Sequence, residues 1–263
     1  MIYLEVLGGL CNRMRTMASF YAFMKEYDID EKFTVIWTCD NGMNCKYENL
    51  FKLNPIYDVV YPTVFIKEKV ILKPCWMLGQ RIFNGIEKIR QVKTIADIPL
   101  SKFRKDIYIR SCHQIYYKTD FSIFEPLSKY TEKVNAIMKP YENRTVYGIH
   151  IRRSDNDQSI RYSPIKLFVE AIQKELENEP DCLFYLASDD KECKQKIREQ
   201  FGESIITQDN IEFARNSEKG IEDALLELMT LSGCKKIYGS YYSSFSEVAA
   251  GWGGLKLTVL EEH

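Results

Sequence analysis

The sequence predicts an α/β protein whose parallel sheets are covered by helices on both faces. Short runs rich in β-branched and aromatic residues alternate along the chain with longer stretches that have helical spacing. Strand-helix alternation of this kind is typical of parallel sheets. The chain has 263 residues, 45% of them hydrophobic, which suits one large domain or two lobes of roughly 100 to 150 residues each.

The apolar runs define the expected elements. Strands are predicted at 2–7, 33–38, 106–109, 146–151, 183–187, 204–206, 236–238 and 257–260. Helices are predicted at 12–27, 77–91, 124–138, 165–176, 191–200, 218–231 and 243–250.

The alternation is most regular in the second half, where residues 141–263 are expected to form a five-stranded, doubly wound unit. The polar segment 139–143, which contains Pro140, is a candidate linker between two lobes. Three prolines, Pro55, Pro62 and Pro74, break the middle of the first half into short pieces. We therefore expect domains at 1–140 and 141–263, with insertions in the first that shape an acceptor site.

Composition argues against several classes of protein. The 36 Lys and Arg residues are balanced by 37 Asp and Glu residues, so we expect no nucleic-acid partner. No window approaches the roughly 18 apolar residues of a membrane span, and the N-terminus resembles a strand rather than a leader. The expected location is the cytoplasm, where the eight cysteines, which form no CxxC pair, would be reduced. Three scattered histidines predict no metal site.

The most informative segment is 147–155 (YGIHIRRSD), in which an apolar strand leads into His150, Arg152, Arg153 and Asp155. Charged residues at the carboxyl end of a parallel strand lie in the crevice where α/β folds bind ligands. Two guanidinium groups there can hold a pyrophosphate with planar, fork-like donors. Adjacent strand residues face opposite ways, so one arginine is expected to face inward. The alternative is an ordinary surface Arg-Asp pair.

Two further segments in the second half also place polar residues after a strand. In 184–190 (FYLASDD), either Ser188 or Asp189 can cap the following helix, while the other acid, Asp190, can meet a ribose or a base. In 237–246 (IYGSYYSSFS), hydroxyl groups and helix-start amides can form a phosphate cradle. A capping box of Ser243 or Ser244 with Glu247 is the compatible alternative.

A glycine turn follows the first strand, at Gly8 and Gly9 in the segment 7–14 (LGGLCNRM). Two glycines let the backbone pass close to a ligand, and the amides that begin the next helix can bind an anion. The same pair is often only a tight connection between a strand and a helix.

Taken together and in this order, the four segments resemble the fucosyltransferase superfamily that includes bacterial α-1,2-, α-1,6- and protein O-fucosyltransferases. His150 to Asp155 satisfies the H-x-R-R-x-D pattern of that family at every fixed position. Residues 8–13 are similar to its N-terminal G-G-x-G-N-Q turn, except that Cys11 replaces a glycine and Arg13 a glutamine. Segments 187–190 and 240–246 are similar to its second and third motifs, and 109–116 to the segment before the interlobe crossing.

The resemblance implies a GT-B-like α/β fold, in which two Rossmann-like lobes face each other across a cleft. It also implies inverting transfer of L-fucose from GDP-β-L-fucose to a glycan or other carbohydrate acceptor, without an obligatory metal or other cofactor. Arg152 and Arg153 would hold the pyrophosphate, with the remaining donor-binding residues at Gly8, Gly9, Asn12, His150, Asp190, Ser243, Ser244 and Phe245.

Candidates for the base that deprotonates the acceptor are Asp155, Asp157 and His113. Two other functions compete with fucosyl transfer. One is a nucleotide-sugar-binding protein without transfer activity, which the departures at Cys11 and Arg13 favour. The other is a transferase that uses a different sugar nucleotide, because the arginine motif recognises the diphosphate and not the sugar.

Overall fold

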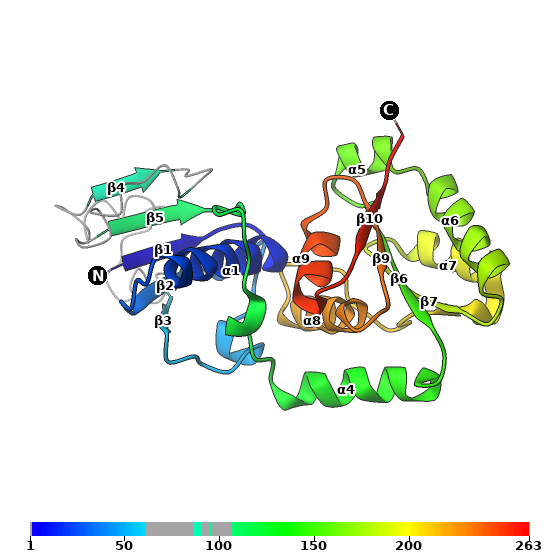
Figure 1. Cartoon of the computed structure of the whole chain (residues 1–263), viewed down its shortest axis with the longest axis horizontal. Helices are drawn as coiled ribbons and strands as arrows, with labels where there is room; N and C mark the ends of the chain where they lie inside the picture. Colours follow the sequence, from blue (N-terminus) through cyan, green and yellow to red (C-terminus); the bar gives the residue numbers. More distant parts are fainter. Residues whose placement is uncertain (1, 62–86, 91–94, 96–106, 263) are drawn as a thin grey trace. The chain divides into compact units, whose positions relative to one another are not determined.

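The computed structural model describes residues 2–61, 87–90, 95 and 107–262 (Figure 1). The chain divides into two compact units. The first comprises Met1–Leu127 and Ala214–Ile221, and the second comprises Ser128–Phe213 and Glu222–His263. The functional roles predicted for residues 1–140 and 141–263 remain predictions.

The first unit contains a parallel sheet whose described strands follow the order β3-β2-β1-β5-β4. These strands are β1 (Ile2–Val6), β2 (Phe33–Trp37), β3 (Tyr57–Val60), β4 (Glu87–Arg90) and β5 (Ile107–Ser111). The strands predicted at 2–7, 33–38 and 106–109 are confirmed as β1, β2 and β5. Neither β3 nor β4 was predicted as a strand.

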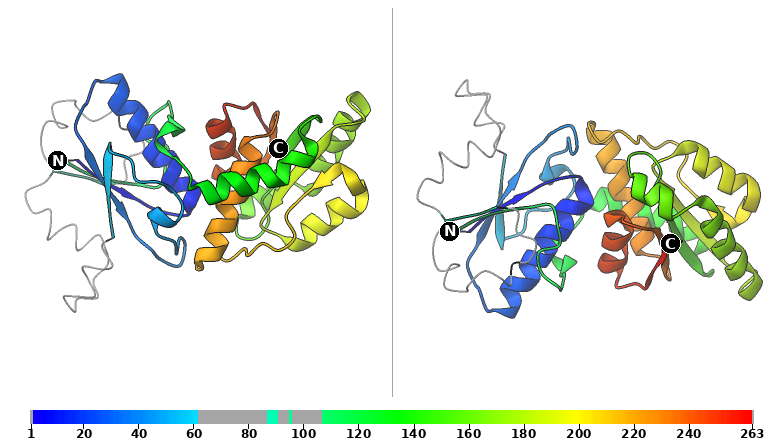
Figure 2. Two further views of the ribbon diagram at one scale, coloured as in Figure 1. Left: turned by 90° about the horizontal axis from the view of Figure 1, so that it is seen from below. Right: turned by 90° about the horizontal axis from the view of Figure 1, so that it is seen from above.

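Helix α1 (Leu10–Glu26) packs on one face of this sheet, as both views of Figure 2 show. Alternate residues of β1 are completely buried, namely Ile2, Leu4 and Val6, because strand side chains alternate between the two faces. From α1, Phe20 meets Phe33 of β2 edge to face at 5.1 Å between ring centroids. Two 3-10 turns complete the described part of the unit, η1 (Tyr47–Asn49) and η4 (Phe121–Ile123).

The helix prediction for 77–91 is wrong at residues 87–90, which the structure describes as a strand. Residues 87–90 form β4, which pairs in parallel with β5 from Glu87 and Ile107 to Arg90 and Arg110. Pairing with a neighbouring strand outweighs weak local helix propensity. The rest of that predicted helix, together with Pro62, Pro74 and Cys75, lies outside the described residues.

The second unit contains the predicted five-stranded parallel sheet, in the order β10-β9-β6-β7-β8. Its strands are β6 (Val146–Ile151), β7 (Leu183–Ser188), β8 (Ile205–Ile206), β9 (Ile237–Ser240) and β10 (Leu257–Leu260). Its helical segments are α4 (Ser128–Met138), η5 (Lys139–Tyr141), α5 (Asp157–Tyr162), α6 (Ile165–Asn178), α7 (Lys191–Phe201), η6 (Gly202–Ser204), most of α8 (Glu218–Ser232) and α9 (Ser244–Gly253). Residues 218–221 of α8 belong to the first unit.

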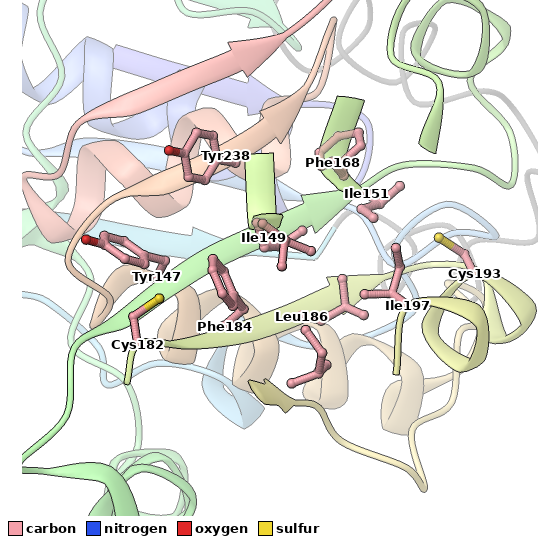
Figure 3. Packing of buried hydrophobic residues seen from close by; sticks show 12 residues of the cluster. Tyr147, Ile149, Ile151, Phe168, Cys182, Phe184, Leu186, Cys193, Ile197 and Tyr238 are labelled. Carbon is pink, nitrogen blue, oxygen red and sulfur yellow. The ribbon is translucent and has the colours of Figure 1, made fainter. Parts of the chain in front are cut away.

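Helices cover both faces of this sheet. Successive side chains of β6 point to opposite faces, so they contact different helices. Ile149 and Ile151 pack with Phe168 of α6 and Ile197 of α7 (Figure 3). Gly148 faces α8, where an added Cβ would lie 3.0 Å from Leu231. All six residues of β6 are buried, as expected of a central parallel strand.

Most predicted helices of the second unit agree with the structure to within a few residues. The helix predicted at 124–138 begins only at Ser128, because the amide of Leu127 donates to the carbonyl of Leu50 in the first unit. The short helix α5, capped by the side chain of Asn156, was not predicted. In the part of the chain that the structure describes, no helix is both long and apolar enough to cross a membrane.

Candidate functional site

Polar side chains gather at the carboxyl edge of the second sheet, where β6, β7 and β9 end side by side. β6 ends at Ile151 and is followed by the two arginines, β7 ends at Ser188 and is followed by two aspartates, and β9 ends at Ser240. Parallel strands place these ends at one edge of the sheet, which is where ligands bind in folds of this class.

Arg152 is the arginine held by carboxylates. Its Nε lies 3.1 Å from Oδ2 of Asp189, and its Nη2 forms an ion pair with Asp155. Its backbone amide donates to Oγ of Ser240 over 3.0 Å, which ties the start of the loop to β9. The side chain is 16% exposed. The guanidinium group is therefore oriented on both sides yet still reaches the surface.

Arg153 has a different environment, as the alternation of neighbouring residues predicts. Its Nη1 donates to the carbonyl of Ile160 over 3.4 Å, and its Nη2 donates to the carbonyl of Ser163. Both carbonyls belong to the end of α5. Burial lowers the pKa of Arg153 from its usual value, and the carbonyl contacts show that this side chain fastens the loop to α5.

Asp189 connects the two arginines. Its carboxylate accepts hydrogen bonds from the amide of Arg153 at 2.7 Å and from Oγ of Ser154 at 2.6 Å, in addition to the ion pair with Arg152. Burial raises the pKa of Asp189, but Arg152 and these hydrogen bonds outweigh burial and hold the pKa below its usual value. The Asp189 carboxylate thus fixes the loop 152–154.

Asp190 caps α7, with Oδ1 accepting from the amide of Cys193 at 2.6 Å. From sequence, a capping role was expected for Ser188 or Asp189 and a ligand role for Asp190. In the structure Asp190 caps the helix and Asp189 faces the arginines. Asp155, at 52% side-chain exposure, lies at the surface beside Arg152.

His150 lies beneath the arginine loop, 3% exposed. Its ring stacks on Phe245 of α9, with 4.7 Å between the ring centroids and 20° between the planes. Burial lowers the pKa of His150 to about 3, and the charge of Asp189 only partly opposes that effect. Nδ1 of His150 has no hydrogen-bond partner among the described residues, so the neutral ring retains one free polar atom.

The loop between β9 and α9 carries the predicted hydroxyl residues. Ser243 is buried and occupies the N-cap position of α9, but its side chain makes no capping hydrogen bond. Tyr242, beside it, has φ of 53°, a left-handed conformation that is uncommon for a residue with a side chain. Asn156 holds this turn by donating to the carbonyl of Tyr242 over 2.9 Å. Ser244 then begins the helix, whose first amides can bind an anion.

The predicted residues of the first unit lie at the carboxyl edge of its own sheet. Gly8 follows β1 with φ of 78°, and an added Cβ would come within 2.7 Å of Nδ2 of Asn12. Gly9 is the N-cap residue of α1. Glycine at position 8 is therefore required both by the backbone and by the close packing of Asn12.

Arg13, where the family turn has glutamine, is completely buried. Its Nε donates to the carbonyl of Gly8 at 2.8 Å and its Nη1 to the carbonyl of Thr38 at 2.7 Å, while Nη2 lies 3.5 Å from Oδ2 of Asp40. The guanidinium also sits over the ring of Trp37, 4.9 Å from its centroid. Burial lowers the pKa of Arg13 to about 10. Arg13 thus joins the ends of β1 and β2 and supports the glycine turn.

His113 follows β5 and is exposed. Its Nε2 lies 3.5 Å from Sγ of Cys112, and its carbonyl accepts a hydrogen bond from Thr16 of α1 at 2.8 Å. In the described residues, no three His, Cys, Asp or Glu side chains are grouped so as to hold a metal ion.

Three residues with clear roles at this edge were not predicted as site residues. Asp189 was treated as a cap, although the Asp-Asp pair itself signals that one acid must turn away from the helix. Ser240 was quoted only within its segment. Ser163 accepts from the amide of Tyr241 at 2.7 Å and donates to the carbonyl of Leu260 at 2.6 Å, and no sequence signal marks it.

The two parallel sheets and the helices around them form a fold that solved fucosyltransferases also have. The chain is similar to the α-1,6-fucosyltransferase NodZ co-crystallised with GDP, with a TM-score of 0.61, 11% identity and coverage of 94% of this chain and 91% of that chain; NodZ comes from Bradyrhizobium. It is also similar to a variant of FUT1 from Arabidopsis thaliana in complex with GDP, with a TM-score of 0.58, 15% identity and coverage of 98% and 69%. POFUT1 in complex with GDP gives a TM-score of 0.55, 12% identity and coverage of 98% of each chain.

No protein-family model matches the chain, and no curated protein matches its sequence. The likeness to solved structures confirms the predicted α/β, GT-B-like fold. At these levels of identity the likeness concerns the fold, and function must be argued from the site itself.

Proposed function

We propose that this protein is an inverting glycosyltransferase that transfers L-fucose from GDP-β-L-fucose to a hydroxyl group of a glycan or other carbohydrate. The observation that carries the proposal is the fixed guanidinium of Arg152 at the carboxyl edge of the second sheet, oriented by Asp189 and Asp155. The shared fold supports it, since similar structures contain GDP or were soaked with GDP-fucose.

The chemistry requires stabilisation of a leaving diphosphate. As the bond between the anomeric carbon and the phosphate oxygen breaks, positive charge grows on the sugar ring and negative charge grows on GDP. A guanidinium that is already oriented lowers the barrier because it needs no reorganisation when that charge develops. We assign this role to Arg152, and we assign the amides that begin α9, with Ser243 and Ser244, to the phosphates.

Arg153 supports the same reaction indirectly in this assignment. Its guanidinium is engaged with the carbonyl groups of Ile160 and Ser163, so it holds the loop that presents Arg152. His150, Phe245 and Asp190 are assigned to the nucleoside side, and Gly8, Gly9 and Asn12 to donor binding from the first unit. The acceptor proton would go to Asp155, Asp157 or His113.

The test uses two matched variants, Arg152→Lys and Arg153→Lys, each assayed for GDP release from GDP-fucose with simple galactosides. Lysine keeps the charge but loses the fork of donors. Arg152→Lys should lower kcat by at least about 100-fold while GDP affinity falls much less. Arg153→Lys should lower kcat only modestly, and its main effect should be a lower free energy of unfolding. Near-normal turnover in both variants would refute the transition-state role.

A panel of GDP-fucose, GDP-mannose and UDP-sugars separates this proposal from its alternatives. Turnover of another donor at a higher kcat/KM would replace fucose as the sugar. Binding of GDP-fucose without GDP release with any acceptor would instead indicate a nucleotide-sugar-binding protein. The enclosed position of Arg13 weakens that second alternative, because the departure from glutamine serves to support the turn.

A further inference from the structure

A buried ion pair lies behind the carboxyl edge of the second sheet, apart from the residues assigned so far. Nζ of Lys194 on α7 lies 2.5 Å from Oε1 of Glu227 on α8, and the two side chains are only 7% and 8% exposed. Burying two charges costs several kcal/mol of desolvation per ion, so such a pair adds little net stability over well-packed apolar residues. A role other than stability is worth seeking.

The pair contacts the loop 207–213, which connects β8 to the segment before α8. Nζ of Lys194 lies 3.5 Å from the carbonyl of Gln208 and 5.6 Å from the ring centroid of Phe213. Lys194 therefore touches both ends of the loop at once, while Glu227 keeps its ammonium group in place.

Three further hydrogen bonds fasten the same loop to the sheet and to α8. Oγ1 of Thr207 donates to the carbonyl of Leu186 at 2.7 Å, and the amide group of Gln208 donates to the hydroxyl of Tyr185 at 2.6 Å. The backbone amide of Glu212 donates to Oδ2 of Asp223 at 3.0 Å. These contacts hold the loop against the sheet and α8, although its residues 209, 210, 212 and 213 are exposed.

The loop also has the right position for a nucleotide. β8 pairs with β7, so the loop leaves the sheet at the same edge as Asp189 and Asp190. Burial is the main cause that lowers the pKa of His150, and the positive charges of Arg152 and Lys194 lower it further. Lys194 therefore lies close enough to the arginine loop to interact electrostatically with His150. The arginine loop and the loop 207–213 thus border the same edge, one after β6 and the other after β8.

We propose that the loop 207–213 forms the wall that faces the nucleobase, and that Lys194 is a positioning residue that sets the preference for one base. This inference rests on the proposed function, in which the arginine loop binds the diphosphate of the same nucleotide. A wall held in one geometry discriminates between bases because a wrong base leaves buried polar groups unpaired. The exposed ring of Phe213, 39% accessible, offers a face for stacking.

The experiment measures binding of GDP, ADP, UDP and inorganic pyrophosphate by calorimetry to the full chain and to Lys194→Met. The variant should bind GDP at least about tenfold more weakly and lose most of the preference for GDP over ADP. Pyrophosphate, which has no base, should bind within about twofold of the normal affinity, since its site is held by Arg152. Equal losses for GDP and pyrophosphate would overturn the proposal.

A double variant, Lys194→Met with Glu227→Met, guards against the cost of a lone buried carboxylate, because apolar replacement of both partners is often neutral in stability. The double variant should remain folded, and like Lys194→Met it should show little preference for GDP over ADP. Its amide hydrogens over 207–213 should exchange faster than those of the unmodified chain. Recovery of normal GDP binding in the double variant would show that the pair is only structural. Lys196→Met on the same helix, at a lysine that is 67% exposed, is the matched control and should change nothing.

The unmodified chain distinguishes failure of this inference from failure of the proposed function. If it binds pyrophosphate and all three nucleotides equally, the base wall is wrong while the anion site stands. If it binds none of the four compounds, the proposed function fails, and the base wall fails with it.

Discussion

Acidification should destabilise the second unit through His150. This residue is buried, and burial lowers its pKa from 6.5 to about 3. In the unfolded chain the ring regains its ordinary pKa. Between pH 6.5 and 3 the imidazole of His150 is therefore protonated in the unfolded state but neutral in the folded state. Stability from this source is therefore fully present above pH 6.5 and is lost as the pH falls toward 3.

The size of the effect follows from the same shift. One pKa unit corresponds to about 1.4 kcal/mol. At pH 5.0 the unfolded imidazole is almost fully protonated while the folded one is still neutral, so His150 costs about 2 kcal/mol relative to pH 7.5. This figure changes little if the folded pKa differs by a unit, because pH 5.0 lies well above it.

The assay compares the native chain with His150→Gln, which does not titrate in this range, by urea unfolding followed with circular dichroism at pH 7.5 and 5.0. Carboxylates that do not interact with His150 contribute equally to both proteins, so the difference between the two pH-dependent losses reports on His150 and its coupling to Asp189. The native chain should lose about 2 kcal/mol more than the variant. If both proteins lose the same free energy, His150 is protonated in the folded state and its burial does not control its charge.

Three further predictions concern the supports of the two sites. Arg13→Met should cost about 2 to 4 kcal/mol in urea unfolding, because the carbonyls of Gly8 and Thr38 lose their donor; a loss below about 0.5 kcal/mol would contradict that role. Gly239→Ala should cost about 1 to 3 kcal/mol, because its Cβ would lie 2.5 Å from Ser246, and Ser246→Gly should recover part of that loss. Transfer activity should survive EDTA, since arginine and helix amides hold the phosphates; loss with EDTA and rescue by Mn²⁺ would refute this.

The second unit could be predicted from sequence because β6, β7 and β9 are buried throughout and have strongly periodic helices between them. The six residues of β6 are continuous in apolar character apart from His150, and the predicted bounds of β6 and β10 match the structure. β3 and β4 were not predicted because they lack such a continuous apolar pattern. They are the edge strands of the first sheet, and their charged residues Asp58, Glu87, Lys88 and Arg90 interrupt any apolar pattern.

Site prediction failed where two neighbouring residues of the same type have different partners. The Asp189-Asp190 pair shows this, because both acids can cap a helix. The choice depends on where the amide of Cys193 and the guanidinium of Arg152 lie in three dimensions. Sequence indicates that one acid caps α7 and the other faces the carboxyl edge of the sheet, but the assignment requires the register of β7 against β6.

For the two arginines, the sequence predicts that they face opposite ways but not which of them faces the ligand edge. His150 and Arg152 share one side of β6 and its continuation, whereas Ile151 and Arg153 share the other. The second side is occupied by α6, and Ser163, in the short link between α5 and α6, accepts a hydrogen bond from Arg153. The first side is that of α9, whose amino end begins at Ser244. In the proposed function it is therefore Arg152, and not Arg153, that acts together with the amides that begin α9. The charge of a diphosphate would be met by a guanidinium that two carboxylates have already oriented.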